Sequence, residues 1–459
     1  MGARAALSDL WALGQMPLAA LDQADLSGSD PVLPSSFAVG TAAQSSMAAA
    51  ALAACEFGHE RGQARQRVAL DMLHAALECT TWFSVDGRVP DLWDPFSGLY
   101  RCADGWVRIH ANFAHHRDGA LRLLGLDPAT ATRAQAEQAL LSWSAEDFEA
   151  AAAQRGLVVA ALRSFEQWDA HPQGQAVAAM PWFTIERIGD APPLTLPALA
   201  ADDRPLQGVK VLELTRILAG PVAGRALAAY GADVMLLNSP HLPNIEAIAD
   251  TSRGKRSAHV DLREPGGRQA LERLVGQAHV WMQGYRPGAL DALGWSPQQL
   301  VQQRPGLVCV SLCAYGAAGP WASRRGFDSL VQTATGFNLA EAQAAGTANP
   351  KALPMQILDH ATGYLMAYGA AVALRRQQRE GGSWLVRVSL AQTGHWLRQM
   401  PRVARGFDVT PPPLDDYLES TASGFGQLRA VRHAVRLSRT PAGWDRPSMP
   451  PGSHAPVWD

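Results

Sequence analysis

Asp359 is the residue whose setting most directly suggests chemistry. It lies in "LPMQILDHATGYLMAYGAAVALRRQQ" (residues 353–378), just before a long helix with an apolar face. A carboxylate in this place can cap the helix by accepting backbone N–H groups, or it can attack an electrophile. This stretch alone permits both interpretations. In either one, the helix N-terminus is expected to keep the carboxylate ionised.

A second candidate is an anion site in "ELTRILAGPVAGRALAAYGADV" (residues 213–234). Gly220 and Pro221 favour a sharp turn from a strand into a helix, and such a helix N-terminus suits a pyrophosphate. An ordinary strand–helix connection would look the same. The stretch lacks G-x-G-x-x-G, and the next strand ends at Asn238 instead of an acid. A nicotinamide dinucleotide is therefore disfavoured.

Cationic side chains gather in "TSRGKRSAHVDLREPGGRQ" (residues 251–269), which contains Arg253, Lys255, Arg256 and Arg263. They can hold phosphate groups, or they can belong to a solvated loop. Tyr285 and Arg286, in "YRPGALDALGW", suit either stacking on a nucleobase or a surface turn.

Three histidines, His110, His115 and His116, lie in "RIHANFAHHRDG". No acid or cysteine completes a ligand set at a familiar spacing, so we predict no metal site. Serine hydrolase chemistry is also disfavoured, because the chain lacks a G-x-S-x-G elbow.

Composition excludes several classes of partner. The formal net charge of the 459 residues is −2, which gives no support for nucleic-acid binding. The five cysteines show no Cys-x-x-Cys pair and suit buried, reduced thiols. No stretch is long and apolar enough to span a bilayer. We therefore predict a soluble, cytoplasmic protein with no nucleic-acid or membrane partner.

The elements that must position these residues follow from the hydrophobic pattern. Apolar strands separated by helices predict an α/β fold with a doubly wound parallel sheet. The strands are expected at residues 209–214, 232–238, 279–283 and 307–312. "GLYRCADGWVRIHANF" predicts two strands around an Asp-Gly turn, within a smaller α+β domain. The predicted division is an N-terminal segment (1–92), the small domain (93–190), a linker (191–205), the large domain (206–400) and a C-terminal tail (401–459).

One segment occurs twice in the chain. "HERGQARQRVALDMLHAALE" (residues 59–78) aligns with "QREGGSWLVRVSLAQTGHWLRQ" (residues 378–399), and a helical stretch precedes each copy. Extending the alignment backwards places Val39 opposite Asp359. The N-terminal segment is thus a degenerate repeat of residues 359–400, expected to pack on the large domain, and it lacks the acid.

Several blocks together resemble the class III coenzyme A transferases, which include formyl-CoA and carnitine CoA-transferases and the α-methylacyl-CoA racemases. In order, they are "PLQGVKVLELTRILAGPVAGRALAAYGADV", "GKRSAHVDLREPGGRQALERLV", "YRPGALDALGW", "PGLVCVSLCAYGAAGPWASRRGFDSLVQTATGF" and "LPMQILDHATGYLMAYGAAVAL". Residues 39–190, with "GLYRCADGWVRIH", resemble the later part of the family chain. The order of the two parts is therefore swapped relative to the family.

The resemblance implies a Rossmann-like large domain, a small domain, and an intertwined homodimer whose active site lies between large and small domains. It implies that Asp359 attacks an acyl-CoA thioester, so that coenzyme A moves to a carboxylic acid through aspartyl anhydride and aspartyl-CoA intermediates. CoA is then a substrate and no cofactor is permanently bound. The implied CoA contacts are Arg216, Ile217, Leu218, Ala219, Val260, Asp261, Leu262, Arg263, Tyr285, Arg286, Arg325, Phe327 and Asp328.

The chain departs from the family pattern at several positions. Phe327 stands where the racemases carry histidine, which favours a transferase over a racemase or isomerase working by proton transfer. Ser239 and Ala292 replace arginines often found in the CoA site, so either Arg253, Lys255 or Arg286 compensates or the affinity for CoA is low. A catalytically inactive paralogue that binds CoA is a further alternative.

Overall fold

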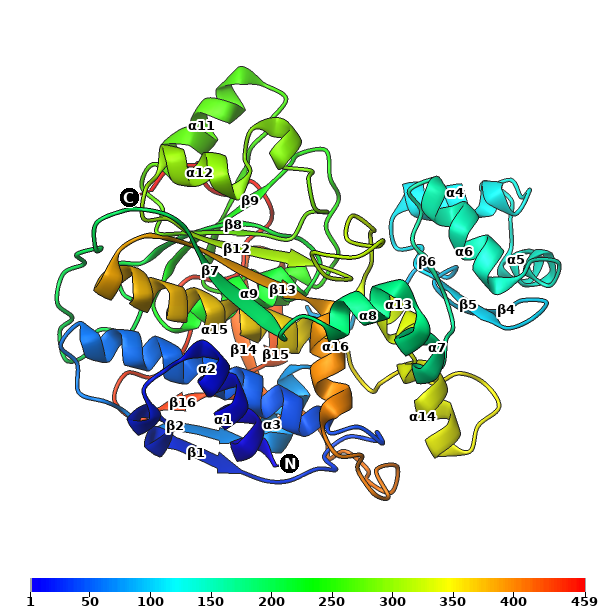
Figure 1. The fold of residues 1–459 in the computed structure, drawn as a ribbon, viewed down its shortest axis with the longest axis horizontal. Coiled ribbons are helices and arrows are strands. Elements are labelled where there is room, and N and C mark those ends of the chain that lie inside the picture. Colours follow the sequence, from blue (N-terminus) through cyan, green and yellow to red (C-terminus); the bar gives the residue numbers. More distant parts are fainter. Residues whose placement is uncertain (1, 459) are drawn as a thin grey trace.

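The computed structural model describes residues 2–458 and shows a mixed α/β fold built on one large sheet (Figure 1). The strand order is β10-β9-β8-β11-β12-β13-β7. Neighbouring strands are parallel, except that β7 runs antiparallel to β13. The strands are β7 (Phe183–Gly189), β8 (Lys210–Leu214), β9 (Asp233–Asn238), β10 (Lys255–His259), β11 (Val280–Gln283), β12 (Val308–Cys313) and β13 (Ser383–Ser389). All four strands expected between residues 209 and 312 form.

Helices cover both faces of this sheet, which explains why its strands are almost continuously apolar. Val211 and Val310 pack in one core with α9 and α15, whereas Leu212 and Cys309 pack in a second core with α11 and α12. These helices are α9 (Ala219–Ala229), α11 (Pro265–Val275), α12 (Pro297–Gln303) and α15 (Ile357–Glu380). The short helices α10 (Ile248–Thr251) and η2 (Asp291–Leu293) lie in the connections.

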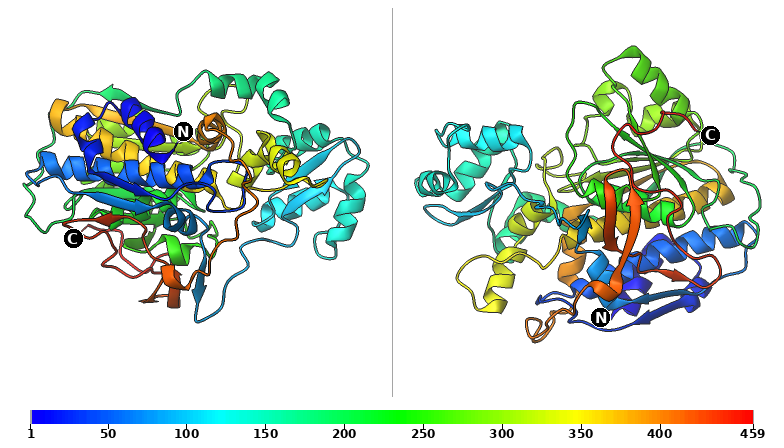
Figure 2. Two further views of the ribbon diagram at one scale, coloured as in Figure 1. Left: turned by 90° about the horizontal axis from the view of Figure 1, so that it is seen from below. Right: turned by 180° about the vertical axis from the view of Figure 1, so that it is seen from behind.

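The repeated segment forms the same elements twice. In the first copy α2 (Val39–Glu60) leads to β2 (Val68–Asp71) and α3 (Met72–Glu78); in the second, α15 leads to β13 and α16 (Leu390–Gln399). The helices α2 and α15 lie side by side in Figures 1 and 2. A small sheet in the order β1-β2-β16 carries the first copy, with β1 (Ala24–Ser27) and β16 (Arg436–Leu437). Helices α1 (Ala3–Gly14) and η1 (Leu18–Gln23) complete this region.

A smaller unit stands to the side of the main body in Figure 1 and has its own core around Tyr100, Val107 and Phe148. It contains the sheet β4-β5-β6 and three helices. They are β4 (Gly98–Arg101), β5 (Trp106–Ile109), β6 (Val159–Ala161), α4 (Ala114–Leu123), α5 (Arg133–Leu140) and α6 (Ala145–Gln154). The strands β4 and β5 flank the predicted Asp-Gly turn.

The structure differs from the sequence-based division in two places. Helices α7 (Phe165–Ala170) and α8 (Pro172–Ala178) lead into β7, which lies within the predicted small domain but forms the edge of the large sheet. The predicted C-terminal tail contains η3 (Asp415–Tyr417), β14 (Leu418–Ser423) and β15 (Gly426–Val431). Strand β15 pairs with β3 (Phe83–Val85), a contact across the whole sequence that local pattern cannot reveal. Helix α13 (Asp328–Ala334) lies between the main body and the smaller unit, and α14 (Phe337–Ala345) lies below the smaller unit in Figure 1. Among the described residues, none of the helices is long and apolar enough to cross a bilayer.

Candidate active site

A cavity of about 290 Å³ opens where the carboxyl ends of β8, β11 and β12 face the small unit. The strand order changes direction between β8 and β11, and parallel sheets commonly bind ligands at such a point. The predicted site residues that line this cavity are Arg216, Ile217, Leu218, Ala219, Tyr285, Arg286, Arg325, Phe327 and Asp359. Phe113, His115 and His116 of the small unit line it too. One chain thus supplies both sides of the cavity.

The cavity carries cations without matching acids. Among residues 2–458, no carboxylate pairs with Arg216, Arg286 or Arg325. The Arg216 guanidinium lies 5.2 Å from the centre of the Phe113 ring, and it donates to the Pro243 carbonyl. Arg325 donates to the Gly156 carbonyl at 3.3 Å. These positive charges suit an anionic ligand such as a phosphate group.

Asp359 is the third residue of α15, and it does not cap that helix. Gln356 occupies the N-cap position, with no side-chain cap hydrogen bond. The Asp359 N–H donates to Oδ2 of Asp328 at 2.9 Å, so Asp328 serves the helix end. No described group donates a hydrogen bond to the Asp359 carboxylate. The interpretation of Asp359 as a helix cap is therefore wrong.

Burial changes the ionisation of this carboxylate. Asp359 is only 8% exposed, and burial together with the nearby charge of Asp328 raises the pKa of its carboxyl well above the ordinary value. Burial also raises the pKa of Asp328, although Gln332 and two main-chain N–H groups donate to it. The expectation that the helix N-terminus favours the ionised form of Asp359 is thus wrong, because the pKa is raised instead of lowered. Desolvation and like charge outweigh the helix dipole here.

A second cavity, of about 350 Å³, also has Asp359 in its lining. It shares Ile217, Leu218, Phe327 and Asp359 with the first cavity. The two spaces therefore adjoin at these four residues, and Asp359 is the acid among them. The rest of its lining is mixed, with Leu92, Leu353 and Met355 beside polar residues such as Arg108 and Ser329.

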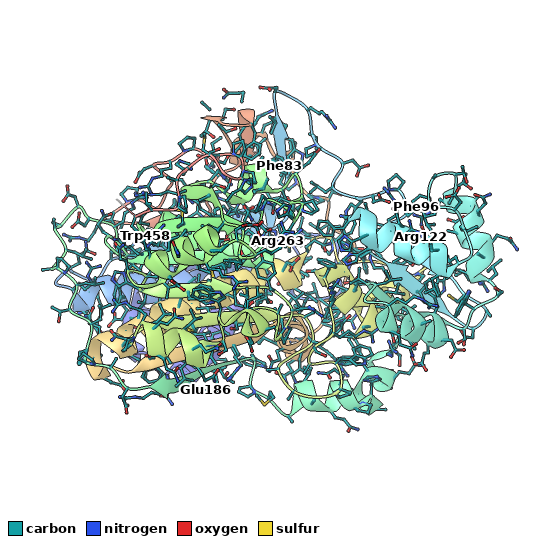
Figure 3. The ribbon with its side chains drawn as sticks, turned by 90° about the horizontal axis from the view of Figure 1, so that it is seen from above. Phe83, Phe96, Arg122, Glu186, Arg263 and Trp458 are labelled. Carbon is teal, nitrogen blue, oxygen red and sulfur yellow. The ribbon has the colours of Figure 1, made fainter. Side chains whose placement is uncertain are left out.

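Four further predicted CoA contacts line a third cavity, of about 320 Å³, which shares Leu242, Tyr285 and Ala289 with the first. They are Val260, Asp261, Leu262 and Arg263. Arg263 pairs with Asp261 at 2.8 Å. In Figure 3, Arg263 lies near the middle of the molecule, while Phe96 and Arg122 mark the small unit to its right. Ser239, where an arginine was expected, also lines this cavity.

Asp328, Arg253 and Lys255 line none of these three cavities. Asp328 is fully buried beneath Asp359. Lys255 is equally buried and pairs with Glu213 at 2.8 Å, and Arg253 pairs with Asp250 and Glu419. The prediction that Arg253 or Lys255 compensates for missing arginines is therefore wrong, because both cations are neutralised within the fold. Arg256 similarly pairs with Asp233 at 3.2 Å.

Residues of the small unit line two of these cavities, although none of them is among the predicted site residues. His115 and His116 line the first cavity, and Arg108 and His110 line the second. The His110 ring stacks on Phe327, with ring centres 3.9 Å apart. The run of histidines after a strand was a usable signal, although we considered it only for a metal site and predicted none there. Within the described chain, no three His, Cys, Asp or Glu side chains are grouped to hold a metal ion.

Several known proteins are similar to parts of this chain. A probable fatty acyl-CoA transferase of Mycobacterium tuberculosis is 33% identical over 201 residues, covering 41% of this chain and 50% of that protein. An acyl-CoA transferase of Gibberella moniliformis is 30% identical over 313 residues, covering 64% and 55%. Human succinyl-CoA:glutarate CoA-transferase is 31% identical over 195 residues, covering 40% and 44%.

The chain thus spans about half the length of the curated relatives it matches. The profile described as CoA-transferase family III matches residues 7–198 and 206–406, on both sides of the linker. The chain belongs to CoA-transferase family III.

Proposed function

We propose that this protein transfers coenzyme A from an acyl-CoA to a free carboxylic acid, with Asp359 as the nucleophile. One observation carries the proposal: an unpaired, nearly buried carboxylate lines both a cavity with three unpaired arginines and a second, adjoining cavity. The cavity with the three arginines suits CoA, and the second cavity suits the acyl group and the acceptor acid. Family membership agrees with this assignment.

The proposed reaction uses one nucleophilic side chain of the protein, Asp359. An Asp359 oxygen attacks the thioester carbonyl, the C–S bond breaks, and CoA leaves as a thiolate. The product of this step is a mixed anhydride between Asp359 and the acyl group. The thiolate then attacks the Asp359 carbonyl carbon and releases the first acid, leaving an aspartyl-CoA thioester. The acceptor carboxylate attacks this thioester and expels the CoA thiolate. That thiolate finally attacks the acyl carbon of the new anhydride, which forms the product thioester and frees Asp359.

The setting of Asp359 supports this role. A carboxylate in water is a weak nucleophile, because it is well solvated. Burial removes that solvation and raises the pKa, so the ionised form is more basic and more reactive when it is present. The cost is that a smaller fraction is ionised at acidic pH. Asp328 holds the helix end through the Asp359 N–H, and we assign it this positioning role instead of a CoA contact.

The first and third cavities together form the proposed CoA site. Arg216, Arg286 and Arg325 would hold phosphate groups near the N-terminus of α9. The connected cavity beside Tyr285 and Val260–Arg263 would take the rest of the nucleotide. The Rossmann-like character of the large sheet and the domain boundaries belong to this proposal, and the homodimer stays a prediction.

Proton transfer at the α-carbon is less well supported. His110 lies against Phe327, which occupies the position of the racemase histidine. However, burial lowers the pKa of His110 to about 3, so its imidazole is a poor base for abstracting such a proton.

Trapping of the intermediate tests the proposal. The chain would be incubated with a panel of acyl-CoAs and then with hydroxylamine, and peptides would be analysed by mass spectrometry. We expect a hydroxamate on the peptide that contains Asp359, and none in Asp359→Ala. Binding of CoA without an adduct would instead favour an inactive paralogue. Deuterium uptake at the α-carbon from heavy water without an adduct would favour proton transfer.

A further inference from the structure

Arg108 is a cation in the second cavity that has no acid to pair with. It lies on β5, the central strand of the small sheet, and pairs in register with Leu99 and Ala160. Its neighbours Val107 and Ile109 enter the core of the small unit, so Arg108 faces the opposite way and lines the cavity. No described carboxylate forms an ion pair with it, and its Nε is buried without a partner.

The surroundings of Arg108 hold the guanidinium ready for a ligand. Its Cζ lies 5.3 Å from the centre of the Trp93 ring. A ring against the flat face leaves the N–H edge free to bind a planar anion with two hydrogen bonds. The side-chain amide of Asn112 donates to the Leu92 carbonyl at 2.8 Å and so fastens the loop that carries Trp93.

Other groups in the same cavity also lack partners. His110 Nδ1 and Ser329 Oγ are buried, and no described group bonds to either atom. Both side chains line the cavity, and both can donate a hydrogen bond. Arg108 is the only arginine or lysine in the lining, and Asp359 is the only acid. A buried cluster of unsatisfied donors is costly unless a ligand or water accepts from it.

We propose that Arg108 binds a second carboxylate of the substrate, so that the enzyme prefers dicarboxylic acids and their mono-CoA thioesters. This inference rests on the proposed function, which places the acid in the second cavity. One carboxyl group of the acid would react at Asp359, and the other would lie against Arg108. Ser329 and His110 would complete its hydrogen bonds, while the apolar walls hold the carbon chain.

A purely structural role for Arg108 makes a different prediction. The charge of Asp328 acts on Arg108 and partly offsets the lowering of its pKa, to about 10, by burial. If Arg108 only balanced the buried acids, its loss would harm all acyl-CoAs equally. If it binds a second carboxylate, its loss would change the ratio between substrates that have that group and substrates that lack it.

The experiment compares matched pairs of thioesters with the full chain. Labelling of Asp359 would be timed for succinyl-, glutaryl- and adipyl-CoA against butyryl-, pentanoyl- and hexanoyl-CoA, because the accepted length is unknown. We expect at least one dicarboxylic member to react about 10- to 100-fold faster than its partner. Arg108→Gln should bring this ratio near one, and Arg108→Lys should retain part of it. Arg101→Gln, an exposed arginine on β4, should leave the ratio unchanged.

The outcomes separate this inference from the function on which it rests. A ratio near one in the native chain, or a ratio unaffected by Arg108→Gln, would overturn it. If no thioester labels Asp359, the proposed function fails. The role of Arg108 is then tested by the binding of free acids, measured through the melting temperature. Free glutarate should raise the melting temperature of the native chain more than its mono-amide does, and Arg108→Gln should abolish that difference. Equal shifts with both compounds would overturn the assignment.

Discussion

The two copies of the repeated segment show how one local structure can support either packing or chemistry. Each copy forms helix, strand and helix, and each strand pairs in parallel on one side and antiparallel on the other. An aspartate from outside the copy accepts main-chain N–H groups at each helix start. Asp30 accepts from Gly40 at 3.0 Å and from Thr41 at 2.9 Å, and Asp328 accepts from Asp359 at 2.9 Å.

The two copies differ in the residue near the start of their first helix. Val39 is completely buried, whereas the matching Asp359 faces two cavities. The small unit follows the first copy in the chain, yet its histidines lie against the cavity of the second copy. The first copy thus acts as packing for α15, and the second copy presents the acid. A helix start becomes a site only where the surrounding elements leave space beside it.

The largest expected effect comes from making the first copy resemble the second. Val39→Asp would bury a carboxylate near Asp30, and we expect a loss of about 3–5 kcal/mol in the free energy of unfolding. Denaturant unfolding measures it, with Val39→Thr as the control of nearly equal shape. The new acid should not form a hydroxamate. A stable variant that is labelled at residue 39 would contradict the distinction between the copies.

Residues 78 and 398 match in the alignment, and they provide a second comparison. Glu78 is buried and accepts from Arg225 at 3.2 Å, Tyr364 at 2.9 Å and the Ala434 N–H at 2.8 Å. Arg398 pairs with Asp169 near the surface. We expect Glu78→Gln to cost about 3 kcal/mol of unfolding free energy and Arg398→Gln less than about 1 kcal/mol. Similar losses of unfolding free energy in both variants would mean that burial does not decide how much these contacts stabilise the fold.

The same pair should differ in its dependence on pH. Although burial opposes it, the contacts with His433 and Arg225 hold the pKa of Glu78 below its ordinary value of 4.5. Its stabilising effect is therefore complete above pH 4.5 and is lost as the pH falls towards the folded-state pKa. Glu78→Gln should remove this acid-side loss, and Arg398→Gln should retain it. Unfolding measured over that pH range tests the difference.

The smallest expected effect concerns the acid that supports Asp359. Asp328→Asn removes a like charge, so the pKa of Asp359 should fall, and the acidic limb of the labelling rate should move down by about one pH unit. Rates of hydroxamate formation as a function of pH measure this shift, with Asp169→Asn as an exposed control. An unchanged midpoint would show that burial alone raises the pKa of Asp359.

The raised pKa values of Asp328 and Asp359 should also make the free energy of unfolding depend on pH. The folded chain binds the protons of Asp328 and Asp359 more tightly than the unfolded chain does, since the pKa values of both are raised above 3.8. Their contribution to the free energy of unfolding therefore falls as pH rises from about 3.8 through the raised pKa values. In Asp328→Asn this fall should be smaller.

Local pattern was enough to identify most of the main sheet. Continuous apolar runs specify buried parallel strands, and the Asp-Gly turn specifies the hairpin of β4 and β5. The repeat was also visible from residue types alone, including the contrast between Val39 and Asp359. Pairings such as β15 with β3, and the entry of β7 into the large sheet, join segments far apart in sequence. No local preference encodes such contacts.

The availability of each charged group was decided only by tertiary structure. Lys255 and Arg253 stand in a basic stretch that suggests phosphate binding, yet Glu213, Asp250 and Glu419 neutralise them in the fold. Arg108 stands alone in an apolar strand, yet it reaches a cavity in which no described carboxylate forms an ion pair with it. The sequence by itself determined which residues carry charge and which strands are buried. The fold decided which charges are paired or desolvated, because those properties depend on neighbours that the chain brings together only when it folds.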